Sequence, residues 1–197
     1  MNIDLSAHGY DEVPAVLQGE FPKLPPDGYI CKVFNAEITK SKAGNLMLVL
    51  SIDIAEGDFQ GHFLNAIKRV HSSDIKWDSS AIYRQLIFDN NNKVSRFFKG
   101  LLTCFELSNP NFHVNLKAFD AAILRSLNIG FIFAEEEYEK RDGSVYTRVF
   151  PKFPATVDKI RNHDFSVPEL RKLPKPSSIQ SKDSFAGEPV PTFDIPF

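Results

Sequence analysis

The feature that most constrains the fold is the run "LMLVLSIDI" at residues 46–54. Apolar side chains occupy every second position, which is the periodicity of a β-strand with one face in a hydrophobic core. The sequence therefore predicts a protein built around a β-sheet. In this strand one face carries Leu46, Leu48, Leu50, Ile52 and Ile54, and the other carries Met47, Val49, Ser51 and Asp53.

A β-hairpin is predicted near the other end of the apolar part of the chain. Two alternating runs, residues 128–140 and 145–153, flank the dipeptide Asp142-Gly143. This dipeptide favours the tight turn of a two-stranded hairpin because both residues tolerate positive φ angles.

Two further strands and one helix are expected. Within residues 28–38 the side chains follow a strand alternation whose apolar positions then change phase, which indicates a bulge near Asn35. Residues 59–70 are interpreted as a third strand, weakened by the glycine inside it. Residues 90–109 place apolar side chains at helical spacing, with an asparagine as the expected cap.

The predicted order is three strands, a helix and two strands. This order fits a mainly β fold, a five-stranded Greek-key barrel of the OB type with a helical insertion between strands 3 and 4. A sandwich or a split α+β sheet would use the same order. The expected organisation is an extended N-terminal strap at 1–27, the barrel domain at 28–160, and a linker with a disordered C-terminal tail at 161–197. From residue 174 the chain is rich in Pro and Ser and cannot bury enough apolar surface to order itself.

The net charge predicts neither a nucleic-acid nor a membrane partner, but its distribution along the chain indicates acidic ends on a mildly basic body. The 197 residues carry a net charge of −2. Residues 1–27 contribute −4 and residues 174–197 contribute −1, so residues 28–173 carry +3. No metal-binding motif or cofactor motif is found, so the sequence predicts neither a metal site nor a cofactor. A stretch of membrane length and a signal peptide are also missing from the sequence, so we expect a cytoplasmic protein without a membrane partner.

Three stretches carry a resemblance to known proteins. The segment "LPPDGYICKVFNAEITKSKAGNLMLVLSIDIAEGDFQGHF" resembles the first three strands of bacteriophage single-stranded DNA-binding proteins of OB fold, and "ILRSLNIGFIFAEEEYEKRDGSVYTRVF" resembles their closing hairpin. The final "DIPF" is similar to the protein-interaction tip of bacterial single-stranded DNA-binding proteins. The resemblance implies a non-enzymatic protein of the bacterial host cytoplasm. It would coat single strands without strong sequence preference during phage DNA replication, recombination or repair, and recruit partner enzymes.

Binding a single strand requires cations for the phosphates and flat rings for the bases. The expected strands and turns carry both kinds of side chain. Phe34, Phe150 and Phe153 are equally compatible with a place in the core. The predicted strand-binding residues are Lys32, Phe34, Lys40, Lys42, Lys68, Arg69, Lys76, Trp77, Lys140, Arg141, Tyr146, Arg148, Phe150 and Lys152.

The tip is predicted to bind replication or recombination proteins. Phe197 would fill a pocket on the partner, and neighbouring side chains would add apolar and acidic contacts. The predicted partner-binding residues are Phe193, Asp194, Ile195, Pro196 and Phe197. The sequence does not determine the oligomeric state, and a homo-oligomer is one option.

Two other functions compete with strand coating. An OB-fold adaptor with little DNA affinity would use the same tip. A metal-dependent nuclease would need clustered carboxylates, for which the candidates are Glu135, Glu136 and Glu137. Neighbours in a strand point to opposite faces, so a solvated strand end explains these three glutamates better.

Overall fold

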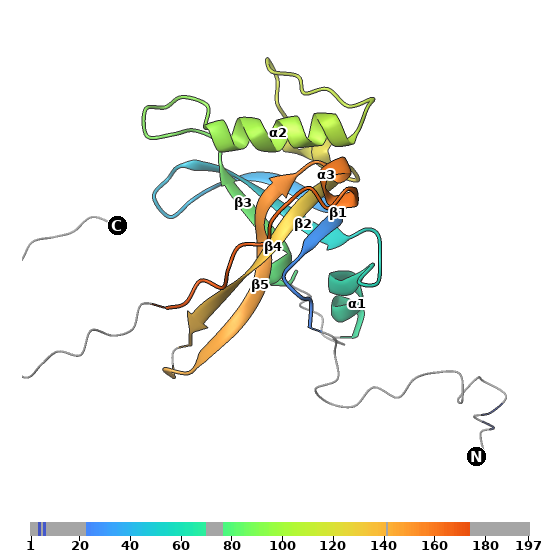
Figure 1. Ribbon diagram of the computed structural model, residues 1–197. Helices are drawn as coiled ribbons and strands as arrows, with labels where there is room; N and C mark the ends of the chain where they lie inside the picture. Colours follow the sequence, from blue (N-terminus) through green and yellow to red (C-terminus); the bar gives the residue numbers. More distant parts are fainter. Residues whose placement is uncertain (1–3, 5, 7–22, 70–76, 141, 174–197) are drawn as a thin grey trace, which may run out of the picture.

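The computed structural model describes residues 4, 6, 23–69, 77–140 and 142–173. The predicted mainly β fold is confirmed, because five strands form one antiparallel sheet in the order β3-β2-β1-β4-β5 (Figure 1). The strands are β1 (Gly28–Lys40), β2 (Leu46–Ile54), β3 (Ile82–Leu86), β4 (Asn128–Glu139) and β5 (Val145–Ala155).

The first strand is the centre of the sheet. It pairs with β4 over Gly28–Lys32 and with β2 from Cys31 to Lys40, so its two neighbours are displaced along it. The register with β2 shifts between Val33 and Asn35, which confirms the predicted bulge near Asn35. A bulge bends a strand and increases its twist. The sheet therefore curls around its own inner face.

The hydrophobic core lies on that inner face. The alternation predicted for β2 is confirmed by its buried side chains, although Leu46 is exposed at the strand end. Fully buried rings on β4 face them, and α2 (Arg96–Ser108) lies across one end of the sheet (Figure 1). The largest fully buried apolar side chains are Phe105, Phe131, Phe133, Leu48, Leu50, Ile52, Ile54, Leu101, Leu124, Ile129 and Val33.

The prediction of a third strand at residues 59–70 is wrong. The segment instead forms helix α1 (His62–Arg69). Gly61 has a φ of +72° in the turn just before the helix, and the buried carboxylate of Asp53 accepts the N–H groups of Phe63 and Leu64. These groups belong to the first helical turn, where N–H donors have no partner within the helix. This long-range cap gives the segment a helical start.

The actual third strand, β3, lies in a stretch with no recognised strand pattern. Tyr83 faces the core and Arg84 faces outward, and a short 3-10 helix, η3 (Ser79–Ala81), precedes the strand. The cap predicted for α2 is also corrected, because Ser95 rather than an asparagine accepts the N–H of Phe97. A second 3-10 helix, η4 (Ala121–Leu124), precedes β4.

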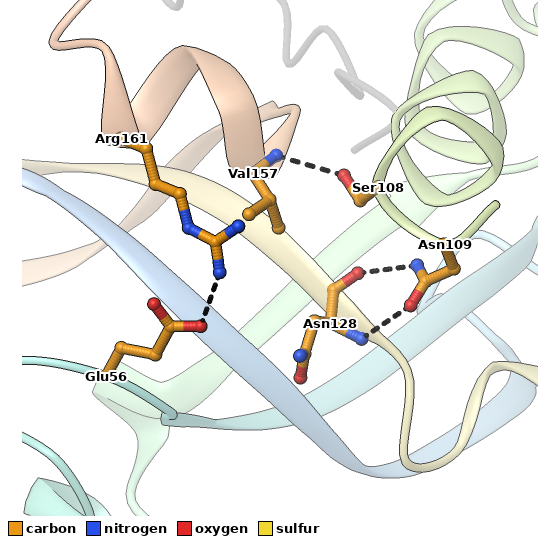
Figure 2. A network of polar contacts seen from close by, with 6 residues as sticks. All are labelled: Glu56, Ser108, Asn109, Asn128, Val157 and Arg161. Carbon is orange, nitrogen blue, oxygen red and sulfur yellow. Dashed lines mark hydrogen bonds and ion pairs between the residues drawn. The ribbon is translucent and has the colours of Figure 1, made fainter.

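Polar contacts fasten the helices to the sheet (Figure 2). The amide of Asn109, just after α2, donates to the carbonyl of Asn128 and accepts its N–H. The hydroxyl of Ser108 accepts the N–H of Val157 in α3 (Val157–Arg161). Arg161 in turn pairs with Glu56 at 2.8 Å. These contacts link α2 to β4 and to α3, and α3 to the turn after β2.

The chain remains packed beyond the predicted end of the barrel domain at residue 160. Phe165 packs beside α3, and Arg171 forms a parallel bridge with Glu136 of β4. The predicted disordered tail from residue 174, and most of the predicted strap at 1–27, lie outside the described residues. Within the described part, none of the helices has the length and apolarity needed to cross a membrane.

We expect Asp53→Asn to destabilise the fold. Asp53 is only 2% exposed, and its two oxygens accept N–H groups from Ile54, Phe63 and Leu64. An amide can supply only one acceptor oxygen, so at least one buried donor loses its partner. The free energy of unfolding should fall by about 1–3 kcal/mol in a urea titration. The exposed Asp58→Asn serves as the control, and equal stability of the two variants would contradict the capping role.

Candidate nucleic-acid interface

The two edge strands of the sheet, β3 and β5, face each other across an open cleft. They lie side by side (Figure 1) without joining into a continuous sheet. The cleft has a volume of about 330 Å³. Its described lining contains three cationic side chains and no acidic one, so it favours anions. The lining residues are Ser79, Ile82, Tyr83, Arg84, Gln85, Arg148, Phe150, Pro151 and Lys152.

The floor of the cleft is neutral. Tyr83 is buried, and its hydroxyl donates to the side-chain oxygen of Gln85 at 3.1 Å. Burial, with a smaller contribution from Cys104, raises the pKa of Tyr83 to about 12. The phenol therefore stays protonated at neutral pH and adds no negative charge beneath the three cations.

Arg148 of β5 lies between rings on the outer face of the hairpin. Its guanidinium carbon is 5.2 Å from the ring centre of Phe150 and 5.6 Å from that of Tyr138. Its Nη2 atom is 3.8 Å from a carboxylate oxygen of Glu136, and its buried Nε atom has no hydrogen-bond partner. Arg148 thus keeps unused donor capacity at the edge of the cleft.

A pair of tyrosines extends the same face along the β4–β5 hairpin, which projects from the body (Figure 1). Tyr138 and Tyr146 are directly paired across the strands, with ring centres 5.3 Å apart at 71°. Both are exposed, at 46% and 40%. The ammonium of Lys140 lies 4.9 Å from the ring centre of Tyr146. Exposed rings flanked by cations are the combination that single-strand binding requires.

A second aromatic pair joins β1 to the segment that leads into η3. Phe34, at the bulge of β1, is exposed, and its ring centre is 5.3 Å from that of the partly buried Trp77. The indole N–H of Trp77 donates to the carbonyl of Ile52 at 3.2 Å. Ser79, two residues further on, already lines the cleft, and two residues of chain span about 7 Å at most. The backbone of Trp77 is therefore close to the cleft lining, while its ring lies against Phe34 and Ile52.

The structure groups some of the predicted strand-binding residues and separates others. Arg148, Phe150 and Lys152 line the cleft, while Lys140 and Tyr146 lie on the projecting hairpin. Phe34 contacts Trp77, which lies two residues before Ser79 of the lining. Lys32 is exposed on β1, on the same face as Phe34, and the ammonium of Lys152 lies 5.7 Å from the ring centre of the exposed Phe153.

The remaining predicted cations do not join this group. Lys40 and Lys42 are exposed at the β1–β2 turn. Lys68 is exposed on α1, and this helix does not lie beside the projecting hairpin (Figure 1). Lys76 and Arg141 lie outside the described residues, as do the side chain of Arg69 and the whole predicted tip at 193–197.

Sequence reasoning missed Arg84 and Tyr138. Arg84 is exposed on the outer face of β3 and lines the cleft. The sequence signal for this strand was a five-residue alternation, in which Ile82, Arg84 and Leu86 share one face and Tyr83 and Gln85 share the other. Tyr138 could have been found by aligning the hairpin about Asp142-Gly143, since that register pairs it with Tyr146.

The three neighbouring glutamates are separated by the strand pleat. Glu136 faces Arg148 across the strands, while Glu135 and Glu137 pair with Val149 and Thr147 on the opposite face. A carboxylate oxygen of Glu137 accepts the N–H of Leu173. Among the described residues, no group of three or more His, Cys, Asp or Glu side chains is placed to hold a metal ion.

No protein-family model matches the chain, and a search of curated proteins finds no significant match.

We expect two substitutions of Trp77 to measure separately how its contacts with Phe34 and with Ile52 contribute to stability. Trp77→Phe keeps a ring against Phe34 but loses the bond to Ile52, so the free energy of unfolding should fall by about 0.5–1.5 kcal/mol. Trp77→Ala should cost more, but less than the roughly 3–5 kcal/mol of a fully buried ring. Urea unfolding followed by circular dichroism measures both variants. Phe97→Ala, at a ring that is 61% exposed on α2, is the control, and a Trp77→Ala variant as stable as this control would refute the structural role.

Proposed function

We propose that this protein binds single-stranded DNA on the surface formed by the cleft and the two aromatic pairs. The observation that carries the proposal is the cleft between β3 and β5, with three cations and no acidic residue in its described lining, together with the exposed rings of Phe34, Tyr138 and Tyr146. We also interpret the curled sheet as an OB-type barrel whose closing edge is open, with α2 as the helix between strands 3 and 4. Barrels of this type bind oligonucleotides on their strands and loops.

The chemistry of the surface favours binding without strong sequence preference. Arg84, Arg148 and Lys152 would contact phosphates, which are the same in every nucleotide. The rings of the Phe34–Trp77 and Tyr138–Tyr146 pairs would stack on bases, and every base has a flat face to offer. A duplex holds its bases inside the helix, so it cannot use these rings.

The proposed biological role follows the sequence resemblance. A strand-coating protein of a bacteriophage would protect exposed single strands during replication, recombination or repair in the bacterial cytoplasm. The predicted tip, Phe193–Phe197, would recruit enzymes that act on the same strand. In this role the protein binds DNA and partners and catalyses no reaction itself.

One observation favours the alternative, an adaptor with little DNA affinity. Helix α2 and the turn before it expose large apolar side chains, with Phe97 at 61%, Val94 at 58% and Leu107 at 64%. Exposed apolar residues of this size are common at protein-binding surfaces. An adaptor would bind protein partners normally and bind oligonucleotides weakly, so the titration below separates the two functions.

We expect oligo-dT to quench the fluorescence of Trp77, the only tryptophan in the chain. A plot of log affinity against log salt should have a slope of about −0.7 for each phosphate neutralised. Arg84→Ala should make this slope shallower by about 0.7, because one cleft cation is lost.

Lys99→Ala is the matched control, since Lys99 is exposed on α2 and does not line the cleft. It should leave the slope and the affinity nearly unchanged. Equal affinity for duplex and single strand, or an affinity that does not respond to salt, would refute the proposed function.

We expect removal of Phe197 to abolish partner binding while leaving the melting temperature and the oligo-dT affinity nearly unchanged. A truncated anchor leaves the partner's pocket unfilled. Pull-down of candidate replication or recombination enzymes, with the intact chain beside the truncated one, measures the effect. Unchanged pull-down, or a large loss of stability, would show that the tip has another role.

A further inference from the structure

The segment that follows α3 returns to the hairpin and lies along β4. Arg171 donates its N–H to the carbonyl of Glu135 and accepts the N–H of Glu137, with N–O distances of 3.2 and 2.9 Å. Leu173 then donates to the carboxylate of Glu137 at 2.9 Å. The pairing of β1 with β4 ends at Ile132, so this segment covers an edge of β4 that β1 leaves open.

This pairing brings Arg171 close to the carboxylate of Glu136, which faces Arg148 across the hairpin. Nη1 of Arg171 is 3.3 Å from Oε1 of Glu136, whereas Nη2 of Arg148 is 3.8 Å from Oε2 of the same carboxylate. One negative charge is thus shared by two guanidinium groups, and the closer contact is to Arg171. The side chain of Arg171 is 73% exposed, while Arg148 lines the cleft.

We propose that Arg171 is a positioning residue that keeps Arg148 available to the phosphates of a bound strand, by competing with it for Glu136. With Arg171 in place, the three side chains carry a net charge of +1. Without it, the carboxylate closes on Arg148 and the net charge at this side of the cleft becomes zero. Arg171 itself lies outside the cleft lining and acts through Glu136. This inference rests on the proposed function, because it assigns a role within the same site.

The test is a set of four variants titrated with oligo-dT in the full-length chain. Arg171→Ala should weaken binding by about two- to fivefold, the range of a solvent-exposed ion pair. It should also make the salt slope shallower by up to about 0.7. Lys172→Ala is the matched control, because Lys172 is the exposed neighbour with the same charge and no ion pair to Glu136 within the described structure. This control should change the affinity less.

Glu136→Gln provides the decisive background. Removing the carboxylate frees Arg148, so binding should become tighter than in the wild type. Adding Arg171→Ala to Glu136→Gln should then have no more effect than Lys172→Ala. Equal losses for Arg171→Ala and Lys172→Ala, or a full Arg171→Ala effect in the Glu136→Gln background, would overturn the proposal.

A measurement without DNA separates this inference from the proposed function. The side-chain Nε–H resonance of Arg148, observed by NMR, should shift in Arg171→Ala and stay in place in Lys172→Ala. If wild-type protein fails to bind oligo-dT, the proposed function is refuted, and the NMR comparison still decides whether Arg171 controls Arg148. An unchanged Arg148 resonance in Arg171→Ala would refute the proposed effect of Arg171 on Arg148.

Discussion

The bulged first strand is the element on which the rest of the structure depends. Strand β1 supports β4 along its first residues and β2 along its remainder, and the bulge between Val33 and Asn35 lies where one pairing gives way to the other. This displacement makes the sheet curl, since a bulged strand bends and twists more strongly. The curl brings the two edge strands face to face. The core on the inner face and the cleft between the edge strands both follow from it.

The open edge of the sheet is stable for a chemical reason. Strand β5 carries Pro151 and Pro154, and proline has no N–H to donate to a neighbouring strand, which suits an edge position. Strand β3 has only five residues, so it offers a short row of backbone groups. The edges therefore approach each other without merging, and cationic side chains line the cleft between them.

The hairpin shows how packing and charge are combined on one face. Cross-strand neighbours on an antiparallel pair interact directly, and the register places Tyr138 against Tyr146 and Glu136 against Arg148. The glutamate alone would neutralise the arginine. Arg171 belongs to the segment after α3 and adds a second cation to the same carboxylate. The C-terminal part of the folded chain thereby contributes to the electrostatics of a surface that it does not line.

The sequence by itself determined the strands with strong alternation, the bulge near Asn35 and the hairpin at Asp142-Gly143, because these follow from local periodicity and turn chemistry. It also identified most of the cations and rings around the cleft. The tertiary structure decided the rest. Residues 62–69 form a helix because Asp53, ten residues before Phe63, caps its first turn. Arg84 joined Arg148 because the curled sheet brings β3 to β5, and Arg171 reached Glu136 because the open edge of β4 accepted a returning segment. Such contacts join residues of different structural elements, and the pattern within one element carries no information about them.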